Sequence, residues 1–308
     1  MKALVTTGPD GPGLALTDVP EPVPASDQAL VRLSTTSLNR GEVRHLAEEE
    51  PGTRLGWDVV GTVIRAATDE SGPAAGTRVV GLVDDAGWAE QVAVPTHALA
   101  AVPDAVTDEA AAVLPIAGLT AWRALELGGM LLGARVLVTG AAGGVGRLAV
   151  QLAHRAGAHV TAVVGRPERR AGLVGLGASE VVVGIDSATG PFDLILESVG
   201  GSSFRRASTI LAPEGVLVTY GRSSGEDSAL DPDWFGDHSG ARVEGLLVFT
   251  EVARRRSGTA QLERMLRLLA DGQLDPQVTR VGSWSDPMPL VQDLLDRRVD
   301  GKAVLLVD

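Results

Sequence analysis

The sequence predicts an α/β protein in which a doubly wound parallel sheet accompanies a smaller β-barrel domain. Three observations support this prediction. The first hundred or so residues form short extended segments separated by proline-rich and glycine-rich joints, a pattern typical of β-structure. From about Ala117, apolar strands alternate with helical segments, which indicates a parallel sheet with helices on both faces. A chain of 308 residues also has the length of roughly two domains.

In the N-terminal part we expect five strands, each a short apolar run bounded by turn signals. They cover residues 3–6, 29–33, 59–64, 78–83 and 89–94. In the second part a helix is expected over 145–156, because its apolar residues recur at helical spacing before Gly157. Pro167 fits the first turn of another helix, which Gly177 ends. The strands expected beside these helices are 135–139, 160–164, 181–183, 194–196, 216–220 and 243–249.

The C-terminal tail carries two amphipathic helices, near 261–269 and 290–297, and a last strand over 303–307. An added strand needs a sheet to join, so we expect the tail to return to the first domain. The predicted domains are therefore 1–116 together with 250–308, and 117–249.

Composition excludes several classes of function. The formal charge of −12 and the lack of a Lys/Arg-rich run argue against a nucleic-acid partner. The absence of cysteine excludes disulfides, thiolate nucleophiles, Fe–S clusters and Cys-ligated zinc. We expect no membrane partner and a cytoplasmic location, because no apolar stretch reaches bilayer length and the start lacks a signal-like segment.

The strongest local signal is a glycine-rich turn between the strand at 135–139 and the helix at 145–156. Residues 141–146 read A-A-G-G-V-G. Glycines let the backbone approach a pyrophosphate, and the helix N-terminus offers free N–H groups with a partial positive charge. Because the flanking strands also fit, the sequence predicts a Rossmann-type dinucleotide-binding turn; the alternative is a glycine-rich turn without a ligand.

The end of the second strand indicates which dinucleotide binds. An NAD-type site places a carboxylate there against the ribose 2′-hydroxyl, whereas this chain has V-V-G-R at 163–166. Arg166, with Arg169 or Arg170, supplies guanidinium groups suited to a 2′-phosphate. We therefore expect NADPH, the alternative being that these arginines form a solvated basic helix start.

Six segments, the glycine-rich turn among them, carry recognisable motifs in a consistent order and spacing: N-R-G-E at 39–42, G-W-D-V-V-G at 56–61, G-L-T-A-W at 118–122, A-A-G-G-V-G at 141–146, E-S-V-G-G at 197–201 and G-K-A-V-L at 301–305. Together they resemble the medium-chain dehydrogenase/reductase superfamily, specifically its zinc-free quinone oxidoreductase branch. The likeness covers nearly the whole chain and implies a GroES-like catalytic domain beside the Rossmann-type one. Two positions depart from many relatives, which have a tyrosine where this chain has Arg44 and Gly184.

Zinc-dependent members of that superfamily carry a Cys near the segment of Asn39, a His at the position of Trp57 and a cluster of four Cys. None of these is present, so the resemblance implies no metal site and a carbonyl polarised by hydrogen bonds. The histidines show no tight ligand spacing, and we expect each to be a surface or packing residue: His45, His97, His154, His159 and His238.

The resemblance also implies where a cofactor would lie. The residue near the nicotinamide-side phosphate or ribose would be Thr120, and the later strand ends would line the ribose and nicotinamide. The candidate cofactor-binding residues are Thr120, Ala142, Gly143, Gly144, Val145, Gly165, Arg166, Arg169, Ser198, Val199, Gly200, Tyr220, Gly221 and Phe249.

Hydride transfer needs a donor for the oxygen that becomes negative, and the candidate catalytic donors are Asn39 and Arg44. The alternatives are that Asn39 caps the following turn and that Arg44 forms a solvated salt bridge. The sequence thus predicts an NADPH-dependent oxidoreductase that reduces a quinone, an enone or a similar α,β-unsaturated carbonyl compound without zinc. An enoyl-thioester reductase and a non-catalytic NADPH-binding sensor are the other hypotheses. A homodimer paired through the apolar strand at 245–249 is also expected, although interior packing would explain that strand equally well.

Overall fold

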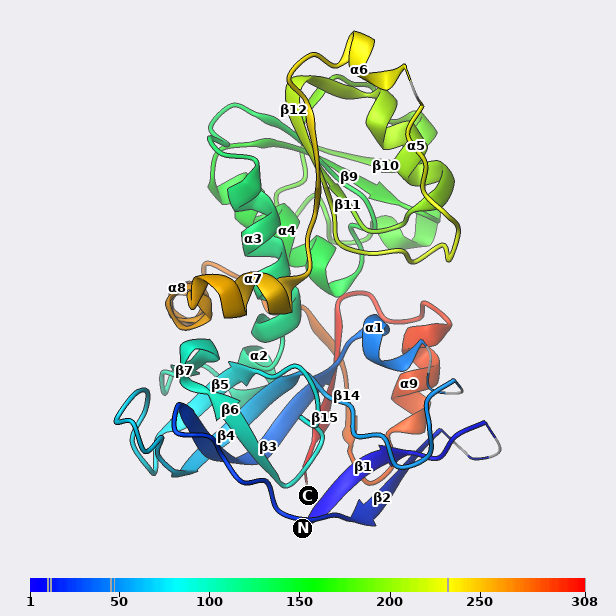
Figure 1. Cartoon of the computed structure of the whole chain (residues 1–308). Coiled ribbons are helices and arrows are strands. Elements are labelled where there is room, and N and C mark those ends of the chain that lie inside the picture. The colour runs from blue at the N-terminus through cyan, green and yellow to red at the C-terminus, as the bar shows by residue number, and fades with distance from the viewer. Residues whose placement is uncertain (10, 12, 45, 47, 232, 308) are drawn as a thin grey trace. The chain divides into compact units, whose positions relative to one another are not determined.

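The computed structural model describes residues 1–9, 11, 13–44, 46, 48–231 and 233–307. The chain divides into two compact units: unit 1 is Met1–Leu119 with Phe249–Asp308, and unit 2 is Thr120–Val248. Their divisions lie three residues and one residue from the expected 116/117 and 249/250. In Figure 1 the chain of unit 1 runs from blue to cyan and again from orange to red, and unit 2 is green to yellow.

Unit 1 is built on a mixed sheet with the order β14-β15-β3-β4-β5-β7, in which β6 also pairs with β3. A separate antiparallel hairpin joins β1 to β2. Strands β2, β7 and β14 lie outside the expected set. The bounds are β1 Lys2–Thr6, β2 Leu14–Asp18, β3 Gln28–Leu38, β4 Asp58–Arg65, β5 Arg78–Leu82, β6 Gln91–Pro95, β7 Leu99–Ala101, β14 Val278–Ser283 and β15 Lys302–Leu306.

The long strand β3 organises this unit because it pairs antiparallel with β4, β6 and β15. The C-terminal strand thereby lies beside β3 although it is far away in sequence, as the red and blue strands of Figure 1 show. One core cluster includes Val31, Val59, Val79 and Val94. Burial of each such side chain contributes about 1.5–3 kcal/mol, so this core fixes the strand ends from which the candidate catalytic residues extend.

The helices of unit 1 are short near the N-terminus and longer in the tail. A second core cluster packs Trp284 and Val291 against Leu38 and Trp88, which explains why the amphipathic C-terminal helix docks on this unit. The bounds are α1 Arg40–Val43, α2 Asp108–Ala111, a π-helical turn Leu114–Gly118, α7 Val248–Arg255, α8 Gly258–Ala270 and α9 Met288–Leu295.

Unit 2 is a parallel sheet with the order β10-β9-β8-β11-β12-β13. The chain runs outward from β8 in one direction and from β11 in the other, so right-handed crossovers place α4 and α5 on opposite faces. The cluster of Leu137, Ile195, Phe204 and Leu217 fills the core beneath α5. The bounds are β8 Arg135–Val138, β9 His159–Val164, β10 Glu180–Val183, β11 Phe192–Glu197, β12 Leu211–Thr219, β13 Arg242–Gly245, α3 Leu119–Leu127, α4 Gly144–Arg155, α5 Gly201–Thr209 and α6 Trp234–Asp237.

The prediction of a helix between Pro167 and Gly177 is wrong. Only a 3-10 turn, Pro167–Arg170, forms there, and turns follow it. Gly172 and Gly177 both adopt positive φ, at 79° and 106°. Left-handed backbone at these positions ends any helix, so the segment crosses to β10 as a loop.

The strand expected over 243–249 is only partly present. Strand β13 ends at Gly245, and α7 already begins at Val248. Phe249 therefore lies in a helix of unit 1 and does not end a strand of unit 2.

One helical stretch meets the length and composition of a membrane span, contrary to expectation. It covers Asp108–Leu127, within the described residues, and most of it is buried. Buried core helices of globular proteins have the same length and composition, so this is weak evidence for a membrane partner.

Candidate active site

The glycine-rich turn after β8 brings the start of α4 very close to the strand end. Gly140 has φ 59°, and Gly143 is the N-cap of α4 with extended backbone and no side-chain cap. A Cβ on Gly146 would lie 2.5 Å from the Gly140 carbonyl oxygen and 2.6 Å from Ala141 Cα, so only glycine allows this approach. The uncapped first turn leaves its N–H groups to bind an anion.

Two arginines hold this turn through the carbonyl of Ala142. The buried Arg147 donates from Nε to that oxygen at 3.3 Å and from an Nη to the Ala171 carbonyl at 2.9 Å. Arg169 donates to the same Ala142 oxygen at 3.4 Å. The loop after β9 is thereby tied to the phosphate turn, a role for Arg147 that sequence reasoning missed.

Strand β9, the second strand of unit 2, is followed by a residue with open space around it. A Cβ on Gly165 would meet nothing within 4 Å, and Arg166 follows it as an exposed residue. Arg170 donates to the Val181 carbonyl at 2.8 Å. The sequence left open whether Arg169 or Arg170 accompanies Arg166 at a 2′-phosphate. Arg169 lies at the glycine-rich turn after β8, whereas Arg170 is hydrogen-bonded to β10.

A buried carboxylate shapes the turn that follows β11. Glu197 Oε1 accepts from the Val199 amide at 3.0 Å and from Ser203 Oγ at 3.0 Å, and Oε2 accepts from the Gly200 amide at 2.9 Å. Thr139 Oγ1 donates to the same carboxylate at 3.3 Å. These donors satisfy the carboxylate without a basic side chain and fix the candidate residues 198–200 against β8.

Three strand ends meet at Ser198. Its amide donates to Thr139 Oγ1 at 2.9 Å, and its hydroxyl donates to the Thr139 carbonyl at 3.2 Å. A Cβ on Gly221 would lie 2.9 Å from the Ser198 carbonyl oxygen, so the chain after β12 passes close by. The structure thus brings Ser198, Tyr220 and Gly221 together at the carboxyl edge of the sheet, while Thr120 lies buried in α3.

The Tyr220 hydroxyl is buried and, among the described residues, has no hydrogen-bond partner. Burial and the nearby Glu197 carboxylate raise the pKa of this phenol. Tyr220 therefore remains neutral at physiological pH and can donate a hydrogen bond to a bound group.

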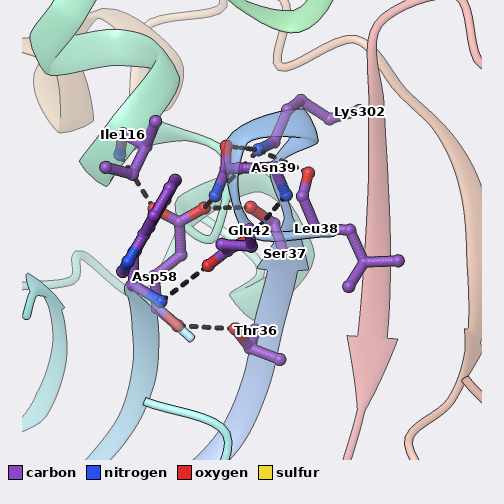
Figure 2. A network of polar contacts seen from close by, with 9 residues as sticks. Thr36, Ser37, Leu38, Asn39, Glu42, Asp58, Ile116 and Lys302 are labelled. Carbon is purple, nitrogen blue, oxygen red and sulfur yellow. Dashed lines mark hydrogen bonds and ion pairs between the residues drawn. The ribbon is translucent and has the colours of Figure 1, made fainter. Parts of the chain in front are cut away.

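In unit 1, Asn39 lies at the centre of a buried polar network, which Figure 2 shows. It is the N-cap residue of α1 and is 8% exposed. Its Nδ2 donates to Asp58 Oδ2 at 2.7 Å, and its Oδ1 accepts from Lys302 Nζ at 2.7 Å. The side chain is thus held by β4 and β15, which is more than the capping role considered from sequence.

Asp58 is completely buried and accepts from several segments. Its Oδ1 accepts a hydrogen bond from the backbone N–H of Ile116 at 2.8 Å. Its Oδ2 accepts hydrogen bonds from the Ser37 hydroxyl and from Asn39 Nδ2. Lys302 Nζ lies 3.5 Å from the same oxygen. A buried carboxylate needs such partners because desolvation of an isolated charge is costly.

Glu42 supports the same turn from beneath. One of its carboxylate oxygens accepts a hydrogen bond from the backbone N–H of Asn39 at 2.6 Å, and the other accepts one from the backbone N–H of Trp57 at 2.8 Å. Burial, and then the neighbouring Asp58 charge, raise the pKa of Glu42 well above its ordinary value.

Two other predicted residues lie elsewhere in unit 1. Arg44 ends α1 with an exposed side chain, and no contact in the described part of the chain joins it to Asn39. Phe249 contacts Trp57 edge-to-face, with the ring centroids 5.1 Å apart, so its assignment to a cofactor-domain strand end is wrong.

Comparisons with known proteins cover most of the chain. The family description "Alcohol dehydrogenase GroES-like domain" matches residues 25–104, and "Zinc-binding dehydrogenase" matches 144–271. A chloroplast envelope quinone oxidoreductase homolog of Arabidopsis thaliana is 33% identical over 231 residues, which cover 67% of this chain and 70% of that protein. The chain belongs to the medium-chain dehydrogenase/reductase superfamily, in its quinone oxidoreductase branch. This confirms the predicted family and the predicted fold class, a Rossmann-type sheet plus a GroES-like domain.

The chain is also similar to two other proteins, which it covers to very different extents. Erythronolide synthase EryA2 of Saccharopolyspora erythraea is 32% identical over 306 residues, but the chain spans only 8% of that protein. An acryloyl-coenzyme A reductase of Sulfurisphaera tokodaii is 28% identical over 258 residues, 72% of this chain and 77% of that one.

Two solved structures superimpose on nearly the whole chain. Mycobacterial Rv1454c complexed with NADPH is 25% identical, with a TM-score of 0.88 and coverage of 99% of this chain and 100% of that one. The quinone oxidoreductase from Coxiella burnetii is also 25% identical, with a TM-score of 0.85 and coverage of 100% and 99%.

The residues of this superfamily member do not fit zinc. The sequence has no cysteine, and Trp57 stands where zinc-dependent relatives have a histidine. No cluster of His, Asp or Glu suited to a metal occurs among the described residues. His154 and His159 are exposed, and His238 stacks on Trp234; the expectation for His45 concerns a residue outside the described ranges.

The residues do fit a phosphorylated dinucleotide. The uncapped start of α4 and the open space at Gly165 are features that a bound cofactor would fill. The residues suited to hold it are Ala142–Val145, Arg166, Arg169, Ser198–Gly200 and Tyr220–Gly221.

Sequence reasoning missed the buried charges behind these residues. Asp58 and Lys302 both stand in quoted motifs, yet neither was predicted to contact Asn39. Glu197 also stands in a quoted motif, whereas Arg147 gave no signal of its own. Both side chains are buried, and a buried charge is seldom left without a partner.

Proposed function

We propose that this chain is an NADPH-dependent oxidoreductase that reduces a conjugated carbonyl compound, a quinone or an enone, by hydride transfer without zinc. The observation that carries the proposal is the phosphate turn after β8 together with a β9 end that lacks a carboxylate and presents Arg166. The NADPH complex of a mycobacterial relative at 25% identity supports the choice of cofactor.

Each part of the candidate site would then have a defined task. When bound, NADPH supplies the hydride. The N–H groups at the start of α4 would hold the pyrophosphate, while Arg166 and Arg169 would pair with the 2′-phosphate. The neutral Tyr220 hydroxyl would donate to the nucleotide near the turn at 198–200.

Asn39 would act on the substrate. Its amide would donate to the carbonyl oxygen as negative charge develops there, and a neutral donor of this kind stabilises an oxyanion when it is held in place before the reaction. Water would then protonate the product, since no side chain of the candidate site is an evident general acid. Arg44 remains a second proposed donor, now with an exposed side chain.

A second candidate substrate is an α,β-unsaturated thioester. The similarity to an acryloyl-coenzyme A reductase and to a segment of a much longer synthase favours this possibility. The same hydride chemistry would serve both substrates, because each presents a carbon–carbon double bond conjugated to a carbonyl group.

The test is to follow NADPH oxidation with a panel of acceptors: a benzoquinone, a simple enone and crotonyl thioesters of coenzyme A and N-acetylcysteamine. We expect turnover with at least one acceptor, and loss of about 100-fold in kcat in Asn39→Ala. The exposed Lys2→Met variant is the matched surface control. Tight NADPH binding without turnover of any acceptor would indicate a non-catalytic sensor instead, and no binding of either reduced nucleotide would refute the proposal.

We further propose a cytoplasmic homodimer. In unit 2, β13 is an edge strand of the sheet formed by the described residues, although the apolar residues that suggested pairing, 246–249, lie beyond its end. Sedimentation equilibrium of the full chain would measure the oligomeric state, and a monomer at micromolar concentration would contradict the proposal.

A further inference from the structure

Two arginines share one carbonyl oxygen of the phosphate turn after β8. The Ala142 oxygen accepts from Arg147 Nε at 3.3 Å and from an Nη of Arg169 at 3.4 Å. A carbonyl oxygen has two lone pairs, so these two contacts fill its capacity. The other end of the same peptide is also held, since the Gly143 N–H donates to the Gly140 carbonyl at 2.9 Å. The orientation of this planar peptide therefore depends on the two guanidinium groups.

The two arginines hold that oxygen from different surroundings. Arg147 is buried, and a second arm of its guanidinium donates to the Ala171 carbonyl at 2.9 Å. Arg169 is only partly buried and belongs to the 3-10 turn Pro167–Arg170, most of which is exposed. Arg147 therefore grips the carbonyl from inside unit 2, whereas Arg169 reaches it from a more exposed loop.

The loop after β9 is fixed at three points. Arg169 contacts the phosphate turn, Arg170 donates to a carbonyl of β10 at 2.8 Å, and the Ala171 carbonyl accepts from Arg147. If Arg169 turned towards a ligand, the first of these contacts would be lost. Arg147 would still join the loop to the phosphate turn, because it contacts both.

The charges at the start of α4 also favour an anion. Residues 144–147, the first turn of this helix, include no acidic side chain, although acidic side chains are the ones that ordinarily stabilise a helix start. The turn ends instead with the buried, cationic Arg147. A guanidinium beside the positive end of a helix raises the electrostatic energy of the empty protein and lowers that of a complex with an anion.

We propose that Arg147 is a positioning residue for nucleotide selectivity: it keeps hold of the Ala142 carbonyl and of the loop after β9, so that Arg169 can leave that carbonyl and pair with the 2′-phosphate of NADPH. This inference rests on the proposed function. Without Arg147, such pairing would take both guanidinium donors from the Ala142 carbonyl, whose residue is 2% exposed, and a buried carbonyl without a donor is costly. NADH has no 2′-phosphate and leaves Arg169 in place, so Arg147 should matter more to NADPH than to NADH.

The test measures the Kd of NADPH and of NADH on the full chain by calorimetry and takes their ratio as the selectivity. The variants are Arg147→Met, Arg169→Met and the two combined. We expect Arg169→Met to lower the selectivity about tenfold, because it removes a charge-assisted contact to phosphate, and Arg147→Met to lower it about fivefold. If Arg147 acts through Arg169, the combined variant loses about tenfold and not the product of about 50-fold. The NADH Kd of Arg147→Met stays within about twofold of wild type.

A second variant covers the case in which Arg147→Met does not fold. Arg147→Lys keeps the positive charge and the aliphatic stem, but not the planar fork that meets two carbonyls at once. It is expected to lower the selectivity as Arg147→Met does, and wild-type selectivity in Arg147→Lys would overturn the proposal, because charge alone would then suffice. Arg155 is an exposed arginine at the other end of α4, and Arg155→Met is the matched control, which should leave both Kd values unchanged.

The outcomes separate this inference from the function on which it rests. If the wild-type chain prefers NADPH but Arg147→Met weakens both nucleotides equally, only the inference is overturned, because a merely structural role distorts the turn for either ligand. Losses of selectivity that multiply in the combined variant would overturn it as well. A wild-type chain that binds NADPH no more tightly than NADH would contradict the cofactor of the proposed function, and the inference with it.

Discussion

Gly146→Ala should separate nucleotide binding from overall folding. A methyl group at this position would lie 2.5 Å from the Gly140 carbonyl oxygen and 2.6 Å from Ala141 Cα. Carbon atoms at optimal separation are about 3.5–4.0 Å apart, so the start of α4 must move by roughly 1 Å away from the turn. Overpacking of this kind costs about 1–3 kcal/mol of stability.

The same shift would affect the anion site more than the core. Arg147 follows directly and donates to the Ala142 carbonyl at 3.3 Å, a contact with no room to lengthen. A hydrogen bond to a charged group is worth about 1.5–3 kcal/mol, so loss of one N–H contact to the pyrophosphate should weaken NADPH binding by about 10- to 100-fold. Isothermal titration calorimetry would measure the Kd, and urea unfolding would measure the stability.

A matched glycine in the same unit provides the control. Gly236 lies in α6, without positive φ, and a Cβ there would meet nothing within 4 Å. Gly236→Ala should leave NADPH affinity unchanged and stability within about 0.5 kcal/mol of wild type. If Gly146→Ala bound NADPH as tightly as Gly236→Ala while losing stability, the turn would not be the nucleotide site. If Gly146→Ala lost neither NADPH affinity nor stability, the close approach of Gly146 to the Gly140 carbonyl would be wrong.

Three further perturbations test separate parts of the molecule. Arg166→Glu should weaken NADPH binding by at least about tenfold and spare NADH, as measured by calorimetry; equal losses for both would contradict the assignment of that loop. Glu42→Gln should flatten the pH dependence of the free energy of unfolding. The native pKa of Glu42 is raised above its ordinary value of 4.5, so its contribution is fully present below pH 4.5 and is lost as pH rises through the native pKa, at up to about 1.4 kcal/mol per pH unit. Urea unfolding at several pH values would measure this loss of stability. An equal dependence of the free energy of unfolding on pH in wild type and Glu42→Gln would refute the prediction. Glu197→Gln places an amide NH2 against donors and should cost about 1–3 kcal/mol, whereas the exposed Glu180→Gln should cost almost nothing; equal unfolding midpoints would contradict this account.

The parts of the fold that local sequence determines were predicted well. The strand, turn and helix over 135–156 depend on contacts between neighbours in sequence, and the glycines mark the turn directly. The segment after Pro167 was predicted wrongly because Gly177 alone was taken as the stop signal, although Gly172 already adopts left-handed backbone. The run at 246–249 was ambiguous, since a short apolar segment fits a strand and a helix equally well. Its contact with Trp57 is far away in sequence.

The candidate site shows the same division between local and distant contacts. Asn39 and the phosphate turn could be identified from motifs, because each is a local pattern. The partners of Asn39 could not, since Lys302 lies 263 residues away in sequence and is buried by packing that no spacing reveals. The network around Asn39 follows only when β3, β4 and β15 are known to be neighbours.

This dependence on distant strands links the proposed role of Asn39 to the stability of unit 1. The last strand, β15, holds Lys302 in place through its pairing with β3, in which Ala303 lies opposite Leu38. Any change that lets β15 fray would release the Lys302 ammonium from the Asn39 amide before the core around Val31 and Val59 is lost, because local opening costs less free energy than global unfolding. Destabilising substitutions at the exposed residues 279–281 of β14, the outer neighbour of β15, should therefore lower the rate of hydride transfer at temperatures where the protein is still folded.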